Sequence, residues 1–287
     1  MDQQRSIINN HIPSKRGFKL ASLNVNKLST HIDEIRILLA DKCLDVAIQE
    51  TKLDVSNNNS DFYICGYELI RRDRLSDGGG GICFYIKSTI NFSVRTDLNV
   101  DELENLCIEI RKPNSKPFIV VNWYRPPNSP IGLFSHLENL IARLDLTNLE
   151  FFLLGDMNAD MASTNYDNNV RHLINITDIY GLHQLISEPT RITDKSSTLI
   201  DLIYTNCPER VVCSGVAHIS ISDHSLVYAF RKLSVNFRKG HTSIMYRNFK
   251  TFNRAKFRND ICNENWEFLA PALDPNQIWT EWKTRFL

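Results

Sequence analysis

Apolar residues along this chain recur in two patterns: short runs typical of buried strands, and longer stretches with helical spacing. Residues 30–40 place Ile32, Ile35 and Leu39 on one side of a predicted helix. Because several strand-like runs follow one another directly, the pattern favours a mixed-sheet α/β sandwich over a doubly wound parallel fold. Two further helices are expected at 131–144 and 170–180. Strands are expected at 18–25, 45–49, 67–71, 81–87, 94–98, 106–111, 117–124, 150–154, 200–206 and 226–230.

A glycine-rich segment, 78–81, separates two of the predicted strands. It lacks the Lys-Ser/Thr pair of a phosphate-binding loop and does not open a helix, so a hairpin turn is expected. Residues 57–61 are expected to form a loop.

The chain is expected to have three parts. Residues 1–16 are polar and predict a disordered leader, and 17–231 carry the strand and helix patterns. Residues 232–287 form a basic, aromatic-rich extension in which a helix is expected to open at Asp274. The helical pattern reaches the last residue, so the chain is expected to be a fragment of a longer reading frame. One face of that helix would carry Ile278, Trp282 and Phe286.

Composition narrows the class of protein. The 287 residues are 43% hydrophobic, and 33 basic residues balance 33 acidic ones, so any nucleic-acid contact must be locally basic. The seven cysteines contain no C-x-x-C pair and predict reduced, buried thiols in an intracellular protein. No signal-peptide pattern or apolar run of membrane-spanning length is visible, so no membrane partner is expected.

Polar side chains follow several of the apolar runs, where a sheet presents chemistry at its rim. Glu50 comes directly after a predicted buried strand and cannot lie in the core unpaired. Asp156 and Asn158 lie two residues apart after another strand, so in extended chain they point the same way. The full set of candidate catalytic residues is Asn24, Glu50, Tyr124, Asp156, Asn158, Asp201, Asp223 and His224.

Each candidate also has an ordinary structural interpretation. Glu50 fits an exposed strand end, and the Gly-Asp-x-Asn pattern at Asp156 is typical of a turn. A single histidine such as His224 is more often structural, Asn24 could cap a turn, and Tyr124 could be a core aromatic. The residues by themselves leave these alternatives open.

Taken in order, the motifs resemble the endonuclease/exonuclease/phosphatase family, which includes apurinic/apyrimidinic endonucleases and DNase I. They are more similar still to the N-terminal endonuclease of non-LTR (LINE-type) retrotransposon polyproteins. This resemblance implies a four-layer α/β/β/α sandwich, DNase I-like, with the site at one rim and a C-terminal helical extension. It covers roughly residues 18–231 and rests on segments 23–26, 48–51, 72–74, 122–127, 154–158, 188–191, 196–203 and 222–224.

The resemblance further implies a divalent metal site. Glu50, Asp223 and Asn24 would hold Mg²⁺ or Mn²⁺, which are hard ions that prefer oxygen ligands. Asn26 stands where apurinic endonucleases carry an aspartate, so this chain has one carboxylate fewer than those enzymes near the metal.

Roles in catalysis follow from the same resemblance. Asp156 would orient or deprotonate water, His224 would contact the scissile phosphate, and Asp201 would hold the imidazole ring. Substrate contacts are expected from Tyr124, Asn158, Thr190, Thr198, Ser222, Arg72, Arg74 and Arg125.

The implied function is a metal-dependent endonuclease that nicks DNA in the nucleus and leaves 3′-hydroxyl and 5′-phosphate ends. A reverse transcriptase is expected to be fused to it in the full-length polyprotein. Two alternatives stay open: a phosphodiesterase or phosphatase of the same fold that acts on a small substrate, and a decayed, non-enzymatic copy that binds DNA.

Overall fold

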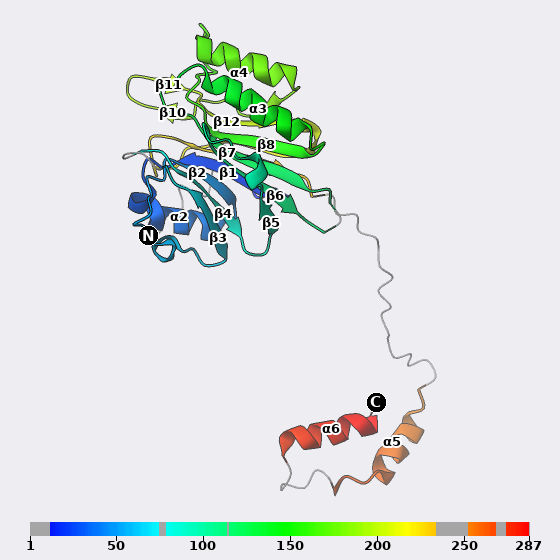
Figure 1. The fold of residues 1–287 in the computed structure, drawn as a ribbon. Coiled ribbons are helices and arrows are strands. Elements are labelled where there is room, and N and C mark those ends of the chain that lie inside the picture. The colour runs from blue at the N-terminus through cyan, green and yellow to red at the C-terminus, as the bar shows by residue number, and fades with distance from the viewer. Residues whose placement is uncertain (1–11, 75–78, 114, 234–251, 268–273, 287) are drawn as a thin grey trace. The chain divides into compact units, whose positions relative to one another are not determined.

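The computed structural model describes residues 12–74, 79–113, 115–233, 252–267 and 274–286. The chain divides into two units, Met1–Asn236 and Phe237–Leu287. The first unit contains two six-stranded sheets that pack face to face (Figure 1).

The first sheet is mainly antiparallel, and one parallel pair of strands lies at its centre. Its strands in spatial order are β13 (Val211–Ala217), β14 (Leu226–Arg231), β1 (Phe18–Asn24), β2 (Asp45–Gln49), β4 (Ile82–Lys87) and β3 (Tyr67–Arg72). β3 and β4 form the hairpin expected around the glycine-rich segment 78–81. Residues 75–78 of the connection between the two strands lie outside the described residues.

The second sheet repeats this plan. Its strands in spatial order are β5 (Asn91–Val94), β6 (Glu104–Arg111), β7 (Phe118–Tyr124), β8 (Glu150–Asp156), β12 (Asp201–Thr205) and β9 (His183–Gln184). A separate two-stranded hairpin, β10 (Arg191–Ile192) and β11 (Ser197–Thr198), projects from the unit near β12.

Each sheet contains one parallel pair joined by a helix. α2 (Leu28–Lys42) connects β1 to β2, and α3 (Leu133–Asp145) connects β7 to β8, with α4 (Asn168–Ile179) beside α3. The carboxyl ends of parallel neighbours lie at the same edge of a sheet. The chain therefore brings the residues that follow β1, β2, β7 and β8 to one rim of the sandwich.

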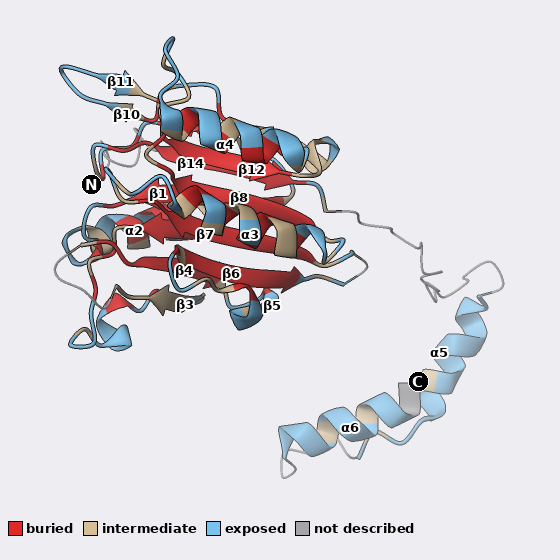
Figure 2. Ribbon diagram, turned by 45° about the horizontal axis from the view of Figure 1, so that its top comes forward, coloured by how far each residue is buried: buried red, intermediate tan, exposed pale blue. Residues whose placement is uncertain are grey.

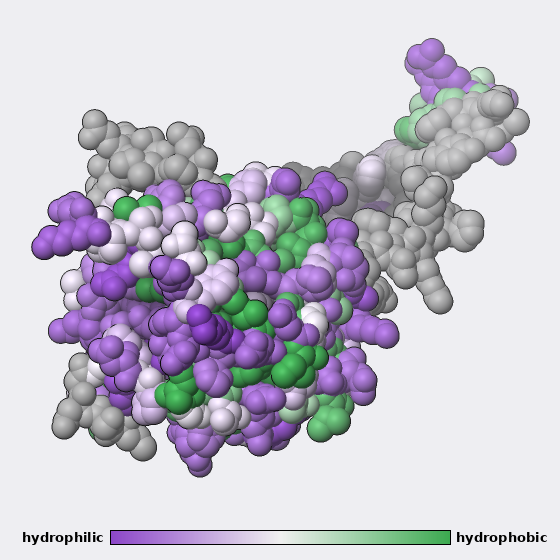
Figure 3. Space-filling view, turned by 90° about the horizontal axis from the view of Figure 1, so that it is seen from above, coloured by the Kyte–Doolittle hydropathy of each residue, from purple (hydrophilic) through white to green (hydrophobic). Residues whose placement is uncertain are grey.

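The layers run α2, first sheet, second sheet, and α3 with α4, which confirms the predicted α/β/β/α sandwich (Figures 1 and 2). α2 buries Ile35 and Leu38 in the core on the outer side of the first sheet. Between the sheets, Phe118 meets Phe18 and Phe152 edge-to-face, with ring centroids 5.1 and 6.3 Å apart. The outer faces of α3 and α4 are exposed, and the unit seen from above is mostly hydrophilic with smaller apolar patches (Figures 2 and 3).

Buried polar bonds also join the sheets. Gln49 donates from Nε2 to Asn122 Oδ1 at 2.7 Å, and Asn122 Nδ2 donates to the carbonyls of the first sheet. At the opposite end, the Arg231 guanidinium donates two 2.7 Å bonds to the carboxylate of Glu150. Because these bonds are directional, they fix how the two sheets sit against each other.

Nearly all predicted elements of this unit lie within two residues of their predicted bounds. The strand predicted at 94–98 is wrong: β5 ends at Val94 and a 3₁₀ turn, η2 (Thr96–Leu98), follows. The loop predicted at 57–61 overlaps a second 3₁₀ turn, η1 (Asn59–Phe62). β13 was not predicted because Ser214 and Gly215 interrupt its apolar pattern, and β9, β10 and β11 have only two residues each.

Two other expectations need correction. Residues 1–11 of the predicted leader lie outside the described residues, but Ile12 is buried in the core beside α2. The cysteines are free, as expected, yet Cys43, Cys65 and Cys262 are exposed, so the prediction of generally buried thiols is wrong for them.

The second unit contains two helices, α5 (Arg254–Asn263) and α6 (Pro275–Phe286), which confirms the helical extension. α6 begins one residue after Asp274, as predicted, and its Ile278 and Trp282 are less exposed than their neighbours. Residues 234–251 of the basic segment lie outside the described residues. Among the helices described in the chain, none is long and apolar enough to span a bilayer.

Candidate active site

The ends of both parallel strand pairs supply the predicted site residues. β1 ends at Asn24, Glu50 follows β2, β7 ends at Tyr124, and β8 ends at Asp156. Hydrogen bonds connect these four side chains directly. The rim predicted from the sequence is therefore a single bonded cluster.

Asn24 lies at the centre of this cluster and is fully buried. Its Nδ2 donates to Glu50 Oε1 and to Asp156 Oδ2, both at 2.9 Å, and its Oδ1 accepts the backbone N–H of Asn26 at 3.0 Å. Asn24 thus presents a donor, not an oxygen, to the carboxylates. In this arrangement Asn24 is the hydrogen-bond donor that holds both acids, and its role as a metal ligand stays a prediction.

Glu50 is ionised and partly open to solvent, with 19% of its side chain exposed. Burial acts to raise its pKa, but hydrogen bonds from Asn24 and Tyr124 and the charge of Lys52 hold the pKa below its usual value. Tyr124 donates its hydroxyl to Glu50 at 2.9 Å, so in this arrangement it orients the carboxylate.

Asp156, Asp201 and His224 form the buried side of the site. Asp156 and Asp201 face each other in the register of β8 and β12. His224 Nδ1 lies 2.9 and 3.1 Å from the two oxygens of Asp201 and 3.9 Å from Asp156. The predicted Asp201–His224 contact is therefore present, although 23 residues separate the two in the chain.

Two carboxylates beside one imidazole perturb the pKa of His224 and the pKa of Asp156. Burial acts to lower the pKa of His224, but the hydrogen bond and charge of Asp201, with Asp156 and Asp223, outweigh it and raise the pKa to about 9. Burial, and then the nearby Asp201, raise the pKa of Asp156 above its usual range. At neutral pH, His224 is a buried cation next to an acid that can hold a proton.

Backbone and hydroxyl bonds hold this group in place. Ser222 Oγ donates to the carbonyl of Asn24 at 2.6 Å and accepts the N–H of His224 at 3.2 Å. Thr190, predicted to contact substrate, is fully buried, and its Oγ1 accepts the N–H groups of Ile200 and Asp201. That prediction is corrected: Thr190 fixes the start of β12.

Asp223 lies outside the buried group. Its Oδ2 accepts a hydrogen bond from Arg191 Nε at 2.8 Å and forms an ion pair with Nη2 at 2.8 Å, and 38% of its side chain is exposed. Burial acts to raise its pKa, and Arg191 and His224 outweigh it and lower the pKa. The metal role of Asp223 stays a prediction, as does the substrate role of Thr198 on the adjoining hairpin.

The three arginines predicted to contact substrate differ in position. Arg72 donates to the carbonyls of Asn105 and Val100, which uses its guanidinium inside the protein. Arg74 pairs with Glu104 and lies 5.9 Å from the ring of Tyr124, so it stays a candidate substrate contact. Arg125 is only 1% exposed, and the structure excludes it as a surface contact.

Asn158 is predicted to bind phosphate through its side-chain amide. Its Nδ2 donates to the carbonyl of Arg125 at 2.8 Å. An amide nitrogen carries two hydrogens, so this bond leaves a second N–H for a ligand. Asn158 also donates its backbone N–H to Asp156 Oδ1 at 3.0 Å.

The chain turns sharply around the site. Asn26, Lys27, Glu50, Lys52 and Asn158 have φ values from 45° to 118°, a region that residues other than glycine seldom adopt. Long-range backbone bonds hold the turns: the N–H of Lys27, for example, donates to the carbonyl of Glu50 at 2.9 Å. Strained backbone of this kind often accompanies functional sites.

Two sets of side chains offer ligand atoms for a cation. Asp156, Asp201 and His224 have ligand atoms within 4.8 Å of one another, but the contact with Asp201 already occupies His224 Nδ1. Glu50 and Asp156, bonded to the same amide of Asn24, offer carboxylate oxygens alone. Hard divalent cations prefer oxygen ligands, so Glu50 with Asp156 fits such an ion better.

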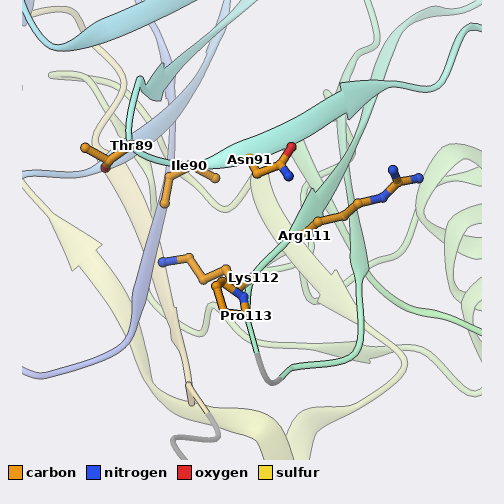
Figure 4. A pocket seen from close by; sticks show the side chains of 6 residues that line it. All are labelled: Thr89, Ile90, Asn91, Arg111, Lys112 and Pro113. Carbon is orange, nitrogen blue, oxygen red and sulfur yellow. The ribbon is translucent and has the colours of Figure 1, made fainter.

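The pocket drawn in Figure 4 lies elsewhere. It sits where β4 leads into β5 and where β6 ends, at the opposite end of the sheets from Tyr124. The side chain of Lys112 extends toward Ile90, whereas Arg111 points away, so the two cations do not converge (Figure 4). The chemistry belongs to the rim, not to this pocket.

Comparison with known proteins agrees with this geometry. A model of the endonuclease/exonuclease/phosphatase family matches residues 21–224, a span that contains every candidate catalytic residue. The chain belongs to this family. The family comprises phosphoester hydrolases that typically depend on a divalent metal. No curated protein sequence matched the chain.

Several solved structures share the fold at low sequence identity. The endonuclease domain of TRAS1, a telomere-specific non-LTR retrotransposon, aligns with a TM-score of 0.61 and 17% identity over 76% of this chain and 99% of that domain. A 3′-5′ exonuclease from Neisseria meningitidis aligns with a TM-score of 0.59 and 19% identity over 75% of this chain and 100% of that chain. An AP endonuclease from Archaeoglobus fulgidus aligns with a TM-score of 0.57 and 18% identity over 75% of this chain and 100% of that chain. At these identities the likeness establishes the fold of this family member.

Sequence reasoning missed two residues that build the site. Lys52 lies 3.3 Å from Glu50, and Gln49 bonds the two sheets directly behind Glu50. Both lie within two residues of Glu50 in the chain, so their position marked them as its neighbours. Nothing in a single sequence indicates which atoms they contact.

Proposed function

We propose that this chain is a metal-dependent endonuclease that nicks DNA and leaves 3′-hydroxyl and 5′-phosphate ends. The observation that carries the proposal is the joining, at one rim, of the ionised Glu50 with Asp156 and the cationic His224–Asp201 pair. Hydrolysis of a phosphodiester requires positive charge opposite the phosphate and an acceptor for the proton of water. This cluster contains both.

Each side chain has a role in that reaction. A divalent cation, Mg²⁺ or Mn²⁺, held by Glu50 would stabilise the negative charge that develops on the phosphate. With Nδ1 engaged by Asp201, the charged His224 donates from Nε2 to a phosphate oxygen. Asp156, whose pKa is raised, accepts the proton of the attacking water, and Asn158 donates its second amide N–H to the phosphate.

A DNA substrate is favoured over a small molecule by motifs and by structural likeness. Segments 122–127 and 188–203 resemble LINE-type endonucleases, and the TRAS1 endonuclease domain shares the fold. On the same grounds we propose that the chain is part of a non-LTR retrotransposon polyprotein, with a fused reverse transcriptase and action in the nucleus.

Nicking of a supercoiled plasmid tests the proposal. We expect conversion to the open circle with Mg²⁺ and none with EDTA, and a DNA polymerase should extend the nick because its 3′ end is a hydroxyl. Glu50→Gln keeps the size of the side chain and serves as the inactive control. Hydrolysis of bis-p-nitrophenyl phosphate without nicking would favour the small-substrate alternative, and absence of both activities would favour a decayed copy.

A further inference from the structure

Arg125 is a buried cation that the proposed mechanism does not use. It follows Tyr124 at the end of β7 and is 1% exposed, and among the described residues no carboxylate lies within 4.0 Å of its guanidinium. Burial lowers its pKa, and its Nε has no partner among the described residues. A buried charge without an ion pair is costly, so packing alone does not explain an arginine here.

The bonds that Arg125 does make converge on the catalytic turn at 156–158. Its backbone N–H donates to the carbonyl of Asp156 at 2.9 Å, and its own carbonyl accepts Nδ2 of Asn158 at 2.8 Å. Its guanidinium Nη1 donates to the carbonyl of Asn158 at 3.2 Å. Asn158, with φ of 45°, is thus held through its side chain and its backbone by one residue.

The rest of the guanidinium is anchored in rigid parts of the fold. Nη2 donates to the carbonyl of Ser129 at 3.0 Å and to Oδ1 of Asn169 at 2.8 Å, in the first turn of α4. The plane also lies 5.1 Å from the ring of Phe134 on α3. The planar guanidinium therefore donates at once to the carbonyls of Asn158 and Ser129 and to Oδ1 of Asn169. The single ammonium of lysine cannot reproduce this arrangement.

We infer that Arg125 is a positioning residue for Asn158: its guanidinium fixes the left-handed turn that aims the amide of Asn158 at the scissile phosphate. The inference rests on the proposed function, in which Asn158 binds that phosphate. It differs from a DNA contact, because Arg125 acts from behind the turn and never meets the substrate.

Arg125→Lys tests this, because it keeps the charge and removes the fork. We expect kcat for nicking to fall about 10- to 100-fold, since small misplacement of a catalytic group has effects of that size. KM for DNA and the salt dependence should change little, whereas loss of a direct phosphate contact would raise KM and flatten the salt dependence.

The decisive comparison is a double-mutant cycle with Asn158→Ala. If Arg125 acts through Asn158, the double variant should be about as slow as Asn158→Ala alone. Independent, additive losses would overturn the inference. Arg231→Lys is the matched control, because Arg231 is equally buried but lies at the opposite end of the sheets, and its kcat should stay that of the wild type.

Failure to fold does not end the test. If Arg125→Lys is not folded by circular dichroism, Asn169→Ala removes one anchor of the guanidinium, and a several-fold loss of kcat that disappears in the Asn158→Ala background is expected. A loss that persists there would refute the inference. A wild-type chain that does not nick would refute the proposed function and this inference with it, whereas a nicking wild type with additive losses would refute the inference alone.

Discussion

Asp201→Asn should move the whole pH–rate profile of nicking to lower pH. The substitution keeps the size and the hydrogen bond of the side chain but removes the charge that lies 2.9 Å from His224 Nδ1. Without that charge, a main cause of the raised pKa of His224 is lost and the pKa falls, so the alkaline limb moves down. Asp201 also raises the pKa of Asp156, so the acid limb should move in the same direction.

The structure indicates how large the effect is. A pKa of about 9 for His224, against an ordinary value of 6.5, means that the site favours the imidazolium by about 3 kcal/mol. At pH 8 about 90% of the wild-type His224 is charged. With the pKa back near 6.5, about 3% is charged, which predicts a roughly 30-fold loss at pH 8 and less than a two-fold loss at pH 6.

The assay is single-turnover nicking of supercoiled plasmid between pH 5.5 and 9.5 at saturating Mg²⁺ and constant ionic strength. The ratio of variant to wild-type rates at each pH separates the two effects of the substitution. A constant ratio measures poorer orientation of the ring, and a ratio that falls with rising pH measures the lost charge. If the ratio stays constant across the range, the reasoning about the charge of Asp201 is wrong.

Four further outcomes are expected. Glu50→Gln should reduce Mg²⁺-dependent nicking by orders of magnitude and leave the melting temperature nearly unchanged, because glutamine can keep the bonds to its neighbours. His224→Ala should be at least as damaging as Asp201→Asn, and the double variant should be little worse than His224→Ala, because the pair acts as a unit. Arg231→Met removes two hydrogen bonds from the buried Glu150 and leaves it the longer contact with Arg210 at 3.5 Å. The fold should lose up to about 3–5 kcal/mol of stability, measured by urea unfolding, without loss of kcat. DNA affinity should fall with salt by a log–log slope of about 0.9 for each phosphate contact.

Each expectation has an outcome that contradicts it. Near-wild-type nicking by Glu50→Gln at low Mg²⁺ would show that this carboxylate is not a ligand. Additive losses in the double variant would separate His224 from Asp201. An unchanged urea midpoint for Arg231→Met would mean that water solvates Glu150 in the variant. A DNA affinity that does not change between low and physiological salt would favour the small-substrate alternative.

The positions of the site were predictable to the extent that they end apolar runs. Asn24, Glu50 and Asp156 were located because a polar residue after a buried strand must lie at a rim. The roles of individual atoms were not predictable. Nothing in the sequence shows that Asn24 turns its nitrogen to the acids, because the rotation of an amide is set by a neighbouring N–H, here that of Asn26.

Predictions based on residue type failed where burial decides the role. Arg125 and Thr190 belong to residue types that commonly contact phosphate, and both lie inside the protein. Their partners lie in other segments of the chain: Asn158 is 33 residues from Arg125, and Asp201, at the start of β12, is 11 residues from Thr190. Periodicity describes one element at a time, so contacts that join separate loops were beyond its reach.

The left-handed residues around the site have a consequence for variation and for engineering. Asn26, Lys27, Glu50, Lys52 and Asn158 each occupy backbone that glycine would adopt at lower energy. Of these, Lys52 is the best candidate for a stabilising glycine, since its backbone N–H already bonds the carbonyl of Gly80. A screen selected for heat resistance alone would favour such exchanges and drift away from catalysis. Selection for nicking at moderate temperature should keep the strained side chains.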